Sequence, residues 1–263
     1  MTRRLLIHPG LHKTGTTTLQ DTLRENREKL DPYVEMMLVR DPVQYLLTGA
    51  CMQFSIRRNK EAKAIIREEA TALFDALERD DPRPILLSNE SLGGYPIGYK
   101  KVYSFIAMPI ALSIIHKAWL DVMGENAPFE VYISTRREGW LRSCWWQRLK
   151  SERYRLPFDQ FEKRYGKAAD HAAFIELCKE HLPDVPIHSC HVEESGHPVK
   201  PVLALLGLSD HFDKLALAEA RNVARAGDAH ERLLALHRSD LKGRPYWQEI
   251  RKIMGREAPQ DSE

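Results

Sequence analysis

Short apolar segments alternate along the chain with longer segments of helical periodicity, and this alternation constrains the fold more than any other feature. Each apolar segment has four to seven residues and is bounded by Pro, Gly or polar residues, which is typical of a buried strand. The strands predicted in this way are Arg4–Ile7, Pro84–Ser88, Phe129–Thr135 and Val185–Ser189.

The intervening segments have the spacing of amphipathic helices. Between residues 61 and 79, for example, apolar residues recur three or four positions apart and so line one helix face. The predicted helices are Thr16–Arg27, Glu61–Arg79, Val102–Met123, Gly139–Lys150, Ala168–His181, Asp228–Leu241 and Pro245–Met254. Strands alternating with helices indicate a three-layer α/β fold, with a mostly parallel central sheet flanked by helices. Because no Gly-, Ser- or Pro-rich linker divides the sequence, we expect residues 1–263 to form a single domain.

The segment LLIHPGLHKTGTTTLQ predicts a strand, a tight turn and a polar loop that opens a helix. The backbone amides of such a loop converge on one point, where the helix dipole favours negative charge. Gly15 lets the backbone approach an anion closely, and Lys13 supplies a full positive charge. The residues predicted to bind the anion are Lys13, Thr14, Gly15, Thr16, Thr17 and Thr18. The alternative is a surface turn with a threonine-rich helix cap.

The order of residues in this loop separates two kinds of phosphate site. A Walker A loop needs a lysine directly after its second glycine, but Thr16 stands there and Lys13 comes two residues before Gly15. The order Lys-Thr-Gly-Thr-Thr resembles the 5′-phosphosulfate loop of sulfotransferases that use 3′-phosphoadenosine 5′-phosphosulfate (PAPS). The wider pattern HxGxHKTGTT is similar to a broad group of bacterial sulfotransferases.

A second motif, FEVYISTRREGWLRSCWWQ, is a predicted strand that runs into a helix. It resembles the family's 3′-phosphate element, in which an arginine at the strand end and a serine on the next helix bind the 3′-phosphate. Arg136 and Ser143 have the matching residue types. The step between them is one residue shorter than the family usually has, so Arg137 or Arg142 is an alternative partner. Adjacent arginines at a strand end are also found as ordinary solvated charges.

A third motif, ILLSNESLGG, is a predicted buried strand followed by polar residues and two glycines. It resembles the Ser-x-Glu element of many bacterial sulfotransferases, in which the glutamate is a candidate general base for the acceptor hydroxyl. The resemblance gives this role to Glu90. The alternative is an exposed loop carboxylate or a helix cap.

Two histidines flank the first turn, and both are candidates for contact with the sulfuryl group or the acceptor. His8 and His12 are four residues apart, but Pro9 and Gly10 between them exclude the helix that metal-ligand spacing would need. We therefore expect no metal site. Near the C-terminus, a segment that includes Arg225 resembles faintly the basic segment that closes over PAPS in animal cytosolic enzymes.

Composition narrows the possible partners. The formal net charge is +2, which is too small to indicate a nucleic-acid partner but is compatible with one local anion site. The N-terminal apolar run is too short for a secretory signal, and residues 102–122 contain Pro, His, Lys and Asp, which favours a buried helix over a membrane span. Four scattered cysteines without a CxxC pair favour a reduced, cytoplasmic protein. The sequence leaves the oligomeric state open.

Together these motifs predict an enzyme with a P-loop-like α/β domain. The resemblance implies a sulfotransferase that moves a sulfuryl group from PAPS to an acceptor hydroxyl and releases 3′-phosphoadenosine 5′-phosphate (PAP). By the same analogy, the acceptor is expected to be a carbohydrate or glycolipid. A nucleotide or small-molecule kinase, and a non-catalytic nucleotide- or glycan-binding module, remain alternatives.

Overall fold

A computed structural model describes residues 3–219 and 228–255, and in this part of the chain the strands form one all-parallel sheet. The strands are β1 Leu5–His8, β2 Glu35–Leu38, β3 Ile85–Ser88, β4 Phe129–Thr135 and β5 Ile187–His191. Their order across the sheet is β2-β3-β1-β4-β5, so β1 is central and pairs with both β3 and β4. The predicted α/β fold class is therefore confirmed.

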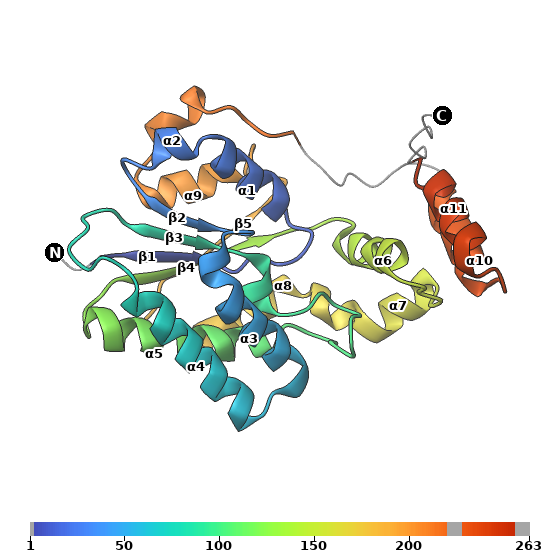
Figure 1. Ribbon diagram of the computed structural model, residues 1–263, viewed down its shortest axis with the longest axis horizontal. Helices are drawn as coiled ribbons and strands as arrows, with labels where there is room; N and C mark the ends of the chain where they lie inside the picture. Colours follow the sequence, from blue (N-terminus) through green and yellow to red (C-terminus); the bar gives the residue numbers. More distant parts are fainter. Residues whose placement is uncertain (1–2, 220–227, 256–263) are drawn as a thin grey trace.

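Helices cover both faces of this sheet (Figure 1). The α-helices are α1 Thr16–Glu25, α2 Arg27–Leu30, α3 Tyr45–Arg57, α4 Lys60–Asp75, α5 Ala107–Met123, α6 Trp140–Ser151, α7 Phe158–Tyr165, α8 His171–His181, α9 Val199–Leu206, α10 Ala229–Arg238 and α11 Gly243–Ile253. The 3₁₀ segments are η1 Pro42–Gln44, η2 Glu90–Gly93, η3 Gly166–Ala169 and η4 Ser209–Lys214. None of the helices in the described ranges is long and apolar enough to span a membrane.

Each strand sends alternate residues into two separate apolar cores. In β1, Leu5 and Ile7 belong to the larger core, with α3, α4 and α5, whereas Leu6 belongs to the smaller core, with α1 and α9. This alternation follows from the period of two in a strand. Because His8 has the same parity as Leu6, its side chain lies on the face covered by α1 and α9.

Several predicted boundaries differ from the structure for identifiable reasons. The first strand extends one residue further, through His8, and the last one begins two residues later, at Ile187 after Pro186. The helix predicted from Val102 begins at Ala107, because a turn closed by a hydrogen bond from Val102 N to Tyr99 O precedes it. The sequence did not predict β2, α2, α3, α7 or α9. In β2 the residues Glu-Met-Met-Leu carry a weak strand signal.

The outer edge of β2 is closed by side chains rather than by another strand. Arg27 Nη1 donates to Met36 O at 3.1 Å, and Leu38 N donates to Asp41 Oδ2 at 2.8 Å. Gln44 Nε2 donates to Leu38 O, and Arg27 Nη2 pairs with Asp41 Oδ2 at 2.6 Å. The backbone groups that an edge strand presents to solvent are therefore partly satisfied within the chain.

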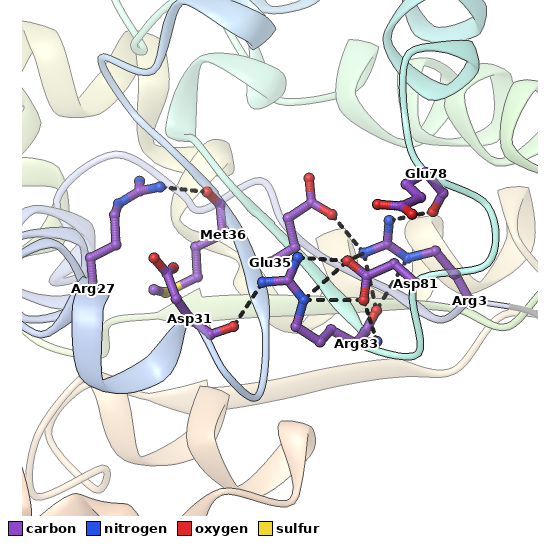
Figure 2. A network of polar contacts seen from close by, with 8 residues as sticks. All are labelled: Arg3, Arg27, Asp31, Glu35, Met36, Glu78, Asp81 and Arg83. Atoms are coloured by element: carbon purple, nitrogen blue, oxygen red, sulfur yellow. Dashed lines mark hydrogen bonds and ion pairs between the residues drawn. The ribbon is translucent and has the colours of Figure 1, made fainter.

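An ion-pair network joins the amino ends of β1, β2 and β3 (Figure 2). The buried guanidinium of Arg3 donates to Glu35 Oε2 at 2.6 Å, to Glu78 O at 2.9 Å and to Arg83 O at 3.2 Å. Arg83 donates in turn to both carboxylate oxygens of Asp81. The hydrogen bonds from Arg83 lower the pKa of Asp81 from its ordinary 3.8 to about 2.

This network predicts a pH-dependent contribution to stability. The depressed pKa means that Asp81 stabilises the fold above about pH 4, and that this contribution is lost as the pH falls toward 2. We expect Asp81→Asn to lower the free energy of unfolding by about 1.5 kcal/mol at pH 7, the value of a hydrogen bond to a charged group. Urea unfolding of both proteins between pH 7 and pH 2 should show the difference shrinking with acidification.

The matched control is Asp75→Asn, because the exposed Asp75 at the end of α4 pairs with Arg79 four residues later. Such surface pairs contribute about 0.5 kcal/mol or less. A loss for Asp81→Asn that is no larger than the loss for Asp75→Asn, or that persists unchanged at pH 2, would contradict the assignment.

Candidate anion-binding site

The loop between β1 and α1 has the backbone conformation of an anion-binding turn. Gly10, Lys13 and Gly15 all have positive φ, at 55°, 72° and 86°. Such left-handed residues between right-handed ones turn successive amides toward one point. Among the described residues no side chain caps α1, whose N-cap is Gly15, so its first-turn amides are free to bind an anion. A Cβ at Gly15 would lie 2.9 Å from Val192 Cγ2 and 3.0 Å from Pro198 Cγ, so glycine is required there.

Lys13 lies half-buried in this loop and close to other charged side chains. Burial lowers its pKa, the cations Lys150 and Arg136 lower it further, and Glu90 opposes them. A bound anion would counteract these causes, because a nearby negative charge favours the protonated amine. The loop after β1, the residues after β3 and the helix after β4 thus bring charged groups to one place.

Glu90 begins η2, directly after β3, and is held by a side chain that sequence reasoning missed. Gln20 is 2% exposed, and its Nε2 donates to Glu90 Oε2 at 3.0 Å and to Ser88 O at 3.4 Å. Gln20 lies one helical turn after Thr16 and therefore on the same face of α1, and this position is the feature of the sequence that could have indicated its role. The contact fixes one carboxylate oxygen of Glu90 beside the loop.

His12 lies next to this carboxylate. Its Nε2 donates to Gly94 O at 3.1 Å, at the end of η2, and its own carbonyl accepts from Trp140 Nε1 at 2.7 Å. Burial lowers the pKa of His12, whereas Glu90 raises it. His12 therefore ties the loop to both η2 and α6.

His8 has a different environment from His12. It is fully buried, both ring nitrogens have serine hydroxyl partners, and its ring stacks on Tyr132 with centroids 5.2 Å apart. Burial lowers its pKa to about 3, so the ring is neutral at physiological pH. This placement favours Glu90 and His12 over His8 for direct contact with a ligand of the loop.

The loop threonines are not equivalent as donors to a ligand. Thr14 is fully buried, and its hydroxyl bonds to Leu11 O at 2.6 Å and to Ser134 Oγ at 2.7 Å, away from the loop opening. Thr16 and Thr18 are 5% and 6% exposed, and Thr17 is half-buried. We infer that Thr14 contributes through its backbone, whereas Thr17 is the most exposed of the four threonines.

Arginines of the second predicted motif line a cavity of about 390 Å³ at the amino end of α6. Arg136 Nε donates to Glu138 O at 3.0 Å and lies 3.8 Å from Glu193 Oε1. Arg137 and Arg142 also line the cavity, and the guanidinium of Arg142 lies 4.0 Å from the ring centroid of Phe158. Ser143 is in the first turn of α6 and its Oγ donates to Gly139 O at 2.9 Å. Three arginines thus line the cavity beside the start of α6, which no side chain of the described residues caps. The guanidinium of Arg137 pairs with Glu194, and Glu162 also lines the cavity.

Three tryptophans of α6 and two histidines of β5 pack in the core or bond to neighbouring groups. Trp140, Trp145 and Trp146 are buried in the larger core, and Trp145 Nε1 donates to Leu156 O. His188 Nε2 bonds to Glu130 Oε2 at 2.7 Å, and His191 Nδ1 bonds to Thr135 Oγ1 at 2.9 Å. Within the described ranges no group of three or more His, Cys, Asp or Glu side chains is placed to hold a metal. Arg225 lies outside the described residues.

Comparison with known proteins assigns the chain to no family. No protein-family model matches the chain, and no curated protein matches it. The function of this chain is therefore inferred from its own motifs and from the geometry of the site.

The conformation of Gly15 gives a prediction about stability. Gly15→Ala should lower the free energy of unfolding by about 1–3 kcal/mol, because a Cβ meets two side chains and a left-handed conformation alone costs about 1 kcal/mol. Gly49→Ala is the matched control, since Gly49 lies inside α3 and a Cβ there meets no atom within 4 Å. That change should raise stability by about 0.5–1 kcal/mol. Urea unfolding of both variants measures the contrast, and equal effects would show that the loop does not need glycine.

Proposed function

We propose that this chain is a sulfotransferase, which transfers a sulfuryl group from PAPS to an acceptor hydroxyl. The observation that supports the proposal best is the loop of Lys13, whose amides, uncapped helix start and neighbouring cations are all suited to a multiply charged anion. Gly15, with φ 86°, adopts without strain the left-handed conformation that turns the loop amides toward one point.

The residues divide into two binding regions. Lys13 and the amides of residues 13–17 would hold the 5′-phosphosulfate end of the co-substrate. The cavity lined by Arg136, Arg137 and Arg142 would accept the 3′-phosphate, because guanidinium groups bind phosphate oxygens in pairs. Trp140 connects the regions, since it begins α6 and its indole donates to the loop at His12 O.

The proposed reaction is an in-line displacement at sulfur. PAPS supplies an activated sulfuryl group and a phosphate leaving group. The acceptor oxygen forms a new bond to sulfur while the bond from sulfur to the bridging oxygen breaks, and PAP leaves with that electron pair. Lys13 and the loop amides stabilise the charge that develops on the leaving oxygen. Glu90 accepts the proton of the acceptor hydroxyl, and Gln20 orients its carboxylate.

The acceptor class is proposed by analogy with the family that the motifs resemble. Turnover of PAPS with a panel of sugar and glycolipid acceptors, followed by release of PAP, tests the reaction. If the protein instead hydrolyses or transfers phosphate from ATP in a magnesium-dependent reaction, the proposal is replaced by a kinase. If PAP binds but no acceptor turns over, a binding module is the better description.

Lys13→Ala should reduce kcat by about a hundredfold or more, because it removes a charge that stabilises the transition state. Lys63→Ala, on the exposed face of α4, is the matched control and should leave kcat unchanged. Steady-state kinetics with PAPS compare the two variants. Near-normal sulfation by Lys13→Ala would exclude Lys13 from the mechanism.

Glu90→Gln should lower kcat by about 10²–10⁴ while the affinity for PAP stays nearly constant. The glutamine keeps an oxygen that can accept from Gln20 Nε2, but it cannot take up a proton. Calorimetry with PAP and steady-state kinetics separate binding from turnover, with the exposed Glu28→Gln as control. A severe loss in His12→Gln beside a mild one in Glu90→Gln would assign the base to His12.

A further inference from the structure

A continuous chain of buried hydrogen bonds runs behind the anion-binding loop. His8 Nδ1 lies 2.9 Å from Ser88 Oγ, and His8 Nε2 lies 3.2 Å from Ser134 Oγ. Ser134 Oγ is 2.7 Å from Thr14 Oγ1, which lies 2.6 Å from Leu11 O. All four side chains are at most 4% exposed, so water does not compete for these contacts. The chain connects the ends of β3, β1 and β4 to the loop.

The direction of every hydrogen bond in this chain follows from counting hydrogens. A carbonyl oxygen can only accept, so the one hydroxyl hydrogen of Thr14 points to Leu11 O. Thr14 Oγ1 must therefore accept from Ser134, which uses the one hydrogen of Ser134. Ser134 Oγ then accepts from His8 Nε2, so that nitrogen carries the proton. Because the buried ring is neutral, the remaining nitrogen, Nδ1, carries no proton and accepts from the hydroxyl of Ser88.

The chain ends at the turn that holds Lys13. The hydroxyl of Thr14 closes residues 11–14 by its bond to Leu11 O, and Lys13 has φ 72° inside that turn. A left-handed conformation is unfavourable for lysine by about 1–2 kcal/mol, so the surroundings must hold it. The hydrogen bonds from His8 to Ser134 and from Ser134 to Thr14 attach this turn to the rigid sheet and so stabilise its conformation.

We infer that His8 is a neutral positioning residue, protonated on Nε2, which fixes the turn of Lys13 through Ser134 and Thr14. It does not touch the acceptor or the transferred group. The consequence for ligand binding rests on the proposed function, because it assumes that the loop binds the phosphosulfate of PAPS. The tautomer and the rigidity of the loop do not depend on that assumption.

The tautomer is tested by nitrogen-15 NMR of the free wild-type protein with labelled histidine. Nε2 of His12 and of His237 also donates to a backbone carbonyl oxygen, so more than one ring can show this tautomer. The inference expects His8 to keep a protonated Nε2 and an unprotonated Nδ1 from pH 8 to pH 5. Its signals should shift in Ser134→Ala, which assigns them to His8. A proton on Nδ1, or a ring that becomes charged in this pH range, would overturn the inference.

The hold on the loop is tested with Thr14→Val and Ser134→Ala, which each remove one hydroxyl from the chain. Rigid backbone has an NMR order parameter of about 0.85, and we expect the amides of residues 11–15 to fall toward 0.6 in both variants. Thr48→Val is the matched control, because Thr48 is a buried threonine whose hydroxyl donates to Gln44 O at 2.9 Å, in α3. That variant should leave the loop rigid. Unchanged order parameters in Thr14→Val and Ser134→Ala would overturn the inference.

Binding of PAP provides the functional readout. Each single variant should weaken PAP affinity about tenfold, and the double variant should be no weaker than the weaker single one, because both act through one chain. Thr14→Ser should recover most of the affinity lost in Thr14→Val. Fully additive losses would overturn the inference. If the wild type does not bind PAP, the proposed function fails, and the tautomer and order parameters alone decide the role of His8.

Discussion

The parallel pairing of β1 with both β3 and β4 is the constraint on which the rest of this structure depends. Parallel strands need crossover connections, and these place helices on both faces and all carboxyl ends at one edge of the sheet. The segments after β1, β3 and β4 therefore meet. They carry Lys13, Glu90 and Arg136, which are 77 and 46 residues apart in the sequence. Ligands of open α/β sheets bind at this edge, where the chain direction across the sheet reverses.

The conformation and charge of the anion-binding loop are unfavourable for the folded chain when no ligand is bound. Lys13 has a left-handed backbone, is partly removed from water and lies near two further cations. Each of these features costs free energy in the chain without a ligand. Anion binding would relieve the electrostatic part of this cost, and the buried hydrogen bonds of Thr14 and Ser134 offset the backbone part.

The fold was largely predictable from the sequence, because its strands and helices have clear periodicity. The edge strand β2 was not, since two methionines give little strand signal and η1 follows closely. The loop residues were predictable because they are contiguous. Gln20 and Ser134 were not, because each acts through a partner that is 70 or more residues away and that only the folded sheet brings close. For His8 the difference was one residue: the strand continues through it, so its ring points into the buried face rather than into the loop.

The side chains that close the outer edge of β2 have a consequence beyond the stability of the native state. An open edge strand can pair with the same strand of another molecule, which is a common start of aggregation. Here Arg27, Asp41 and Gln44 occupy the backbone positions that such pairing would use. Asp41 and Gln44 lie in the segment directly after β2, and Arg27 lies eight residues before it. Because these contacts are local in the sequence, they can form as soon as the strand does and protect the β2 edge of the sheet from intermolecular pairing early in folding.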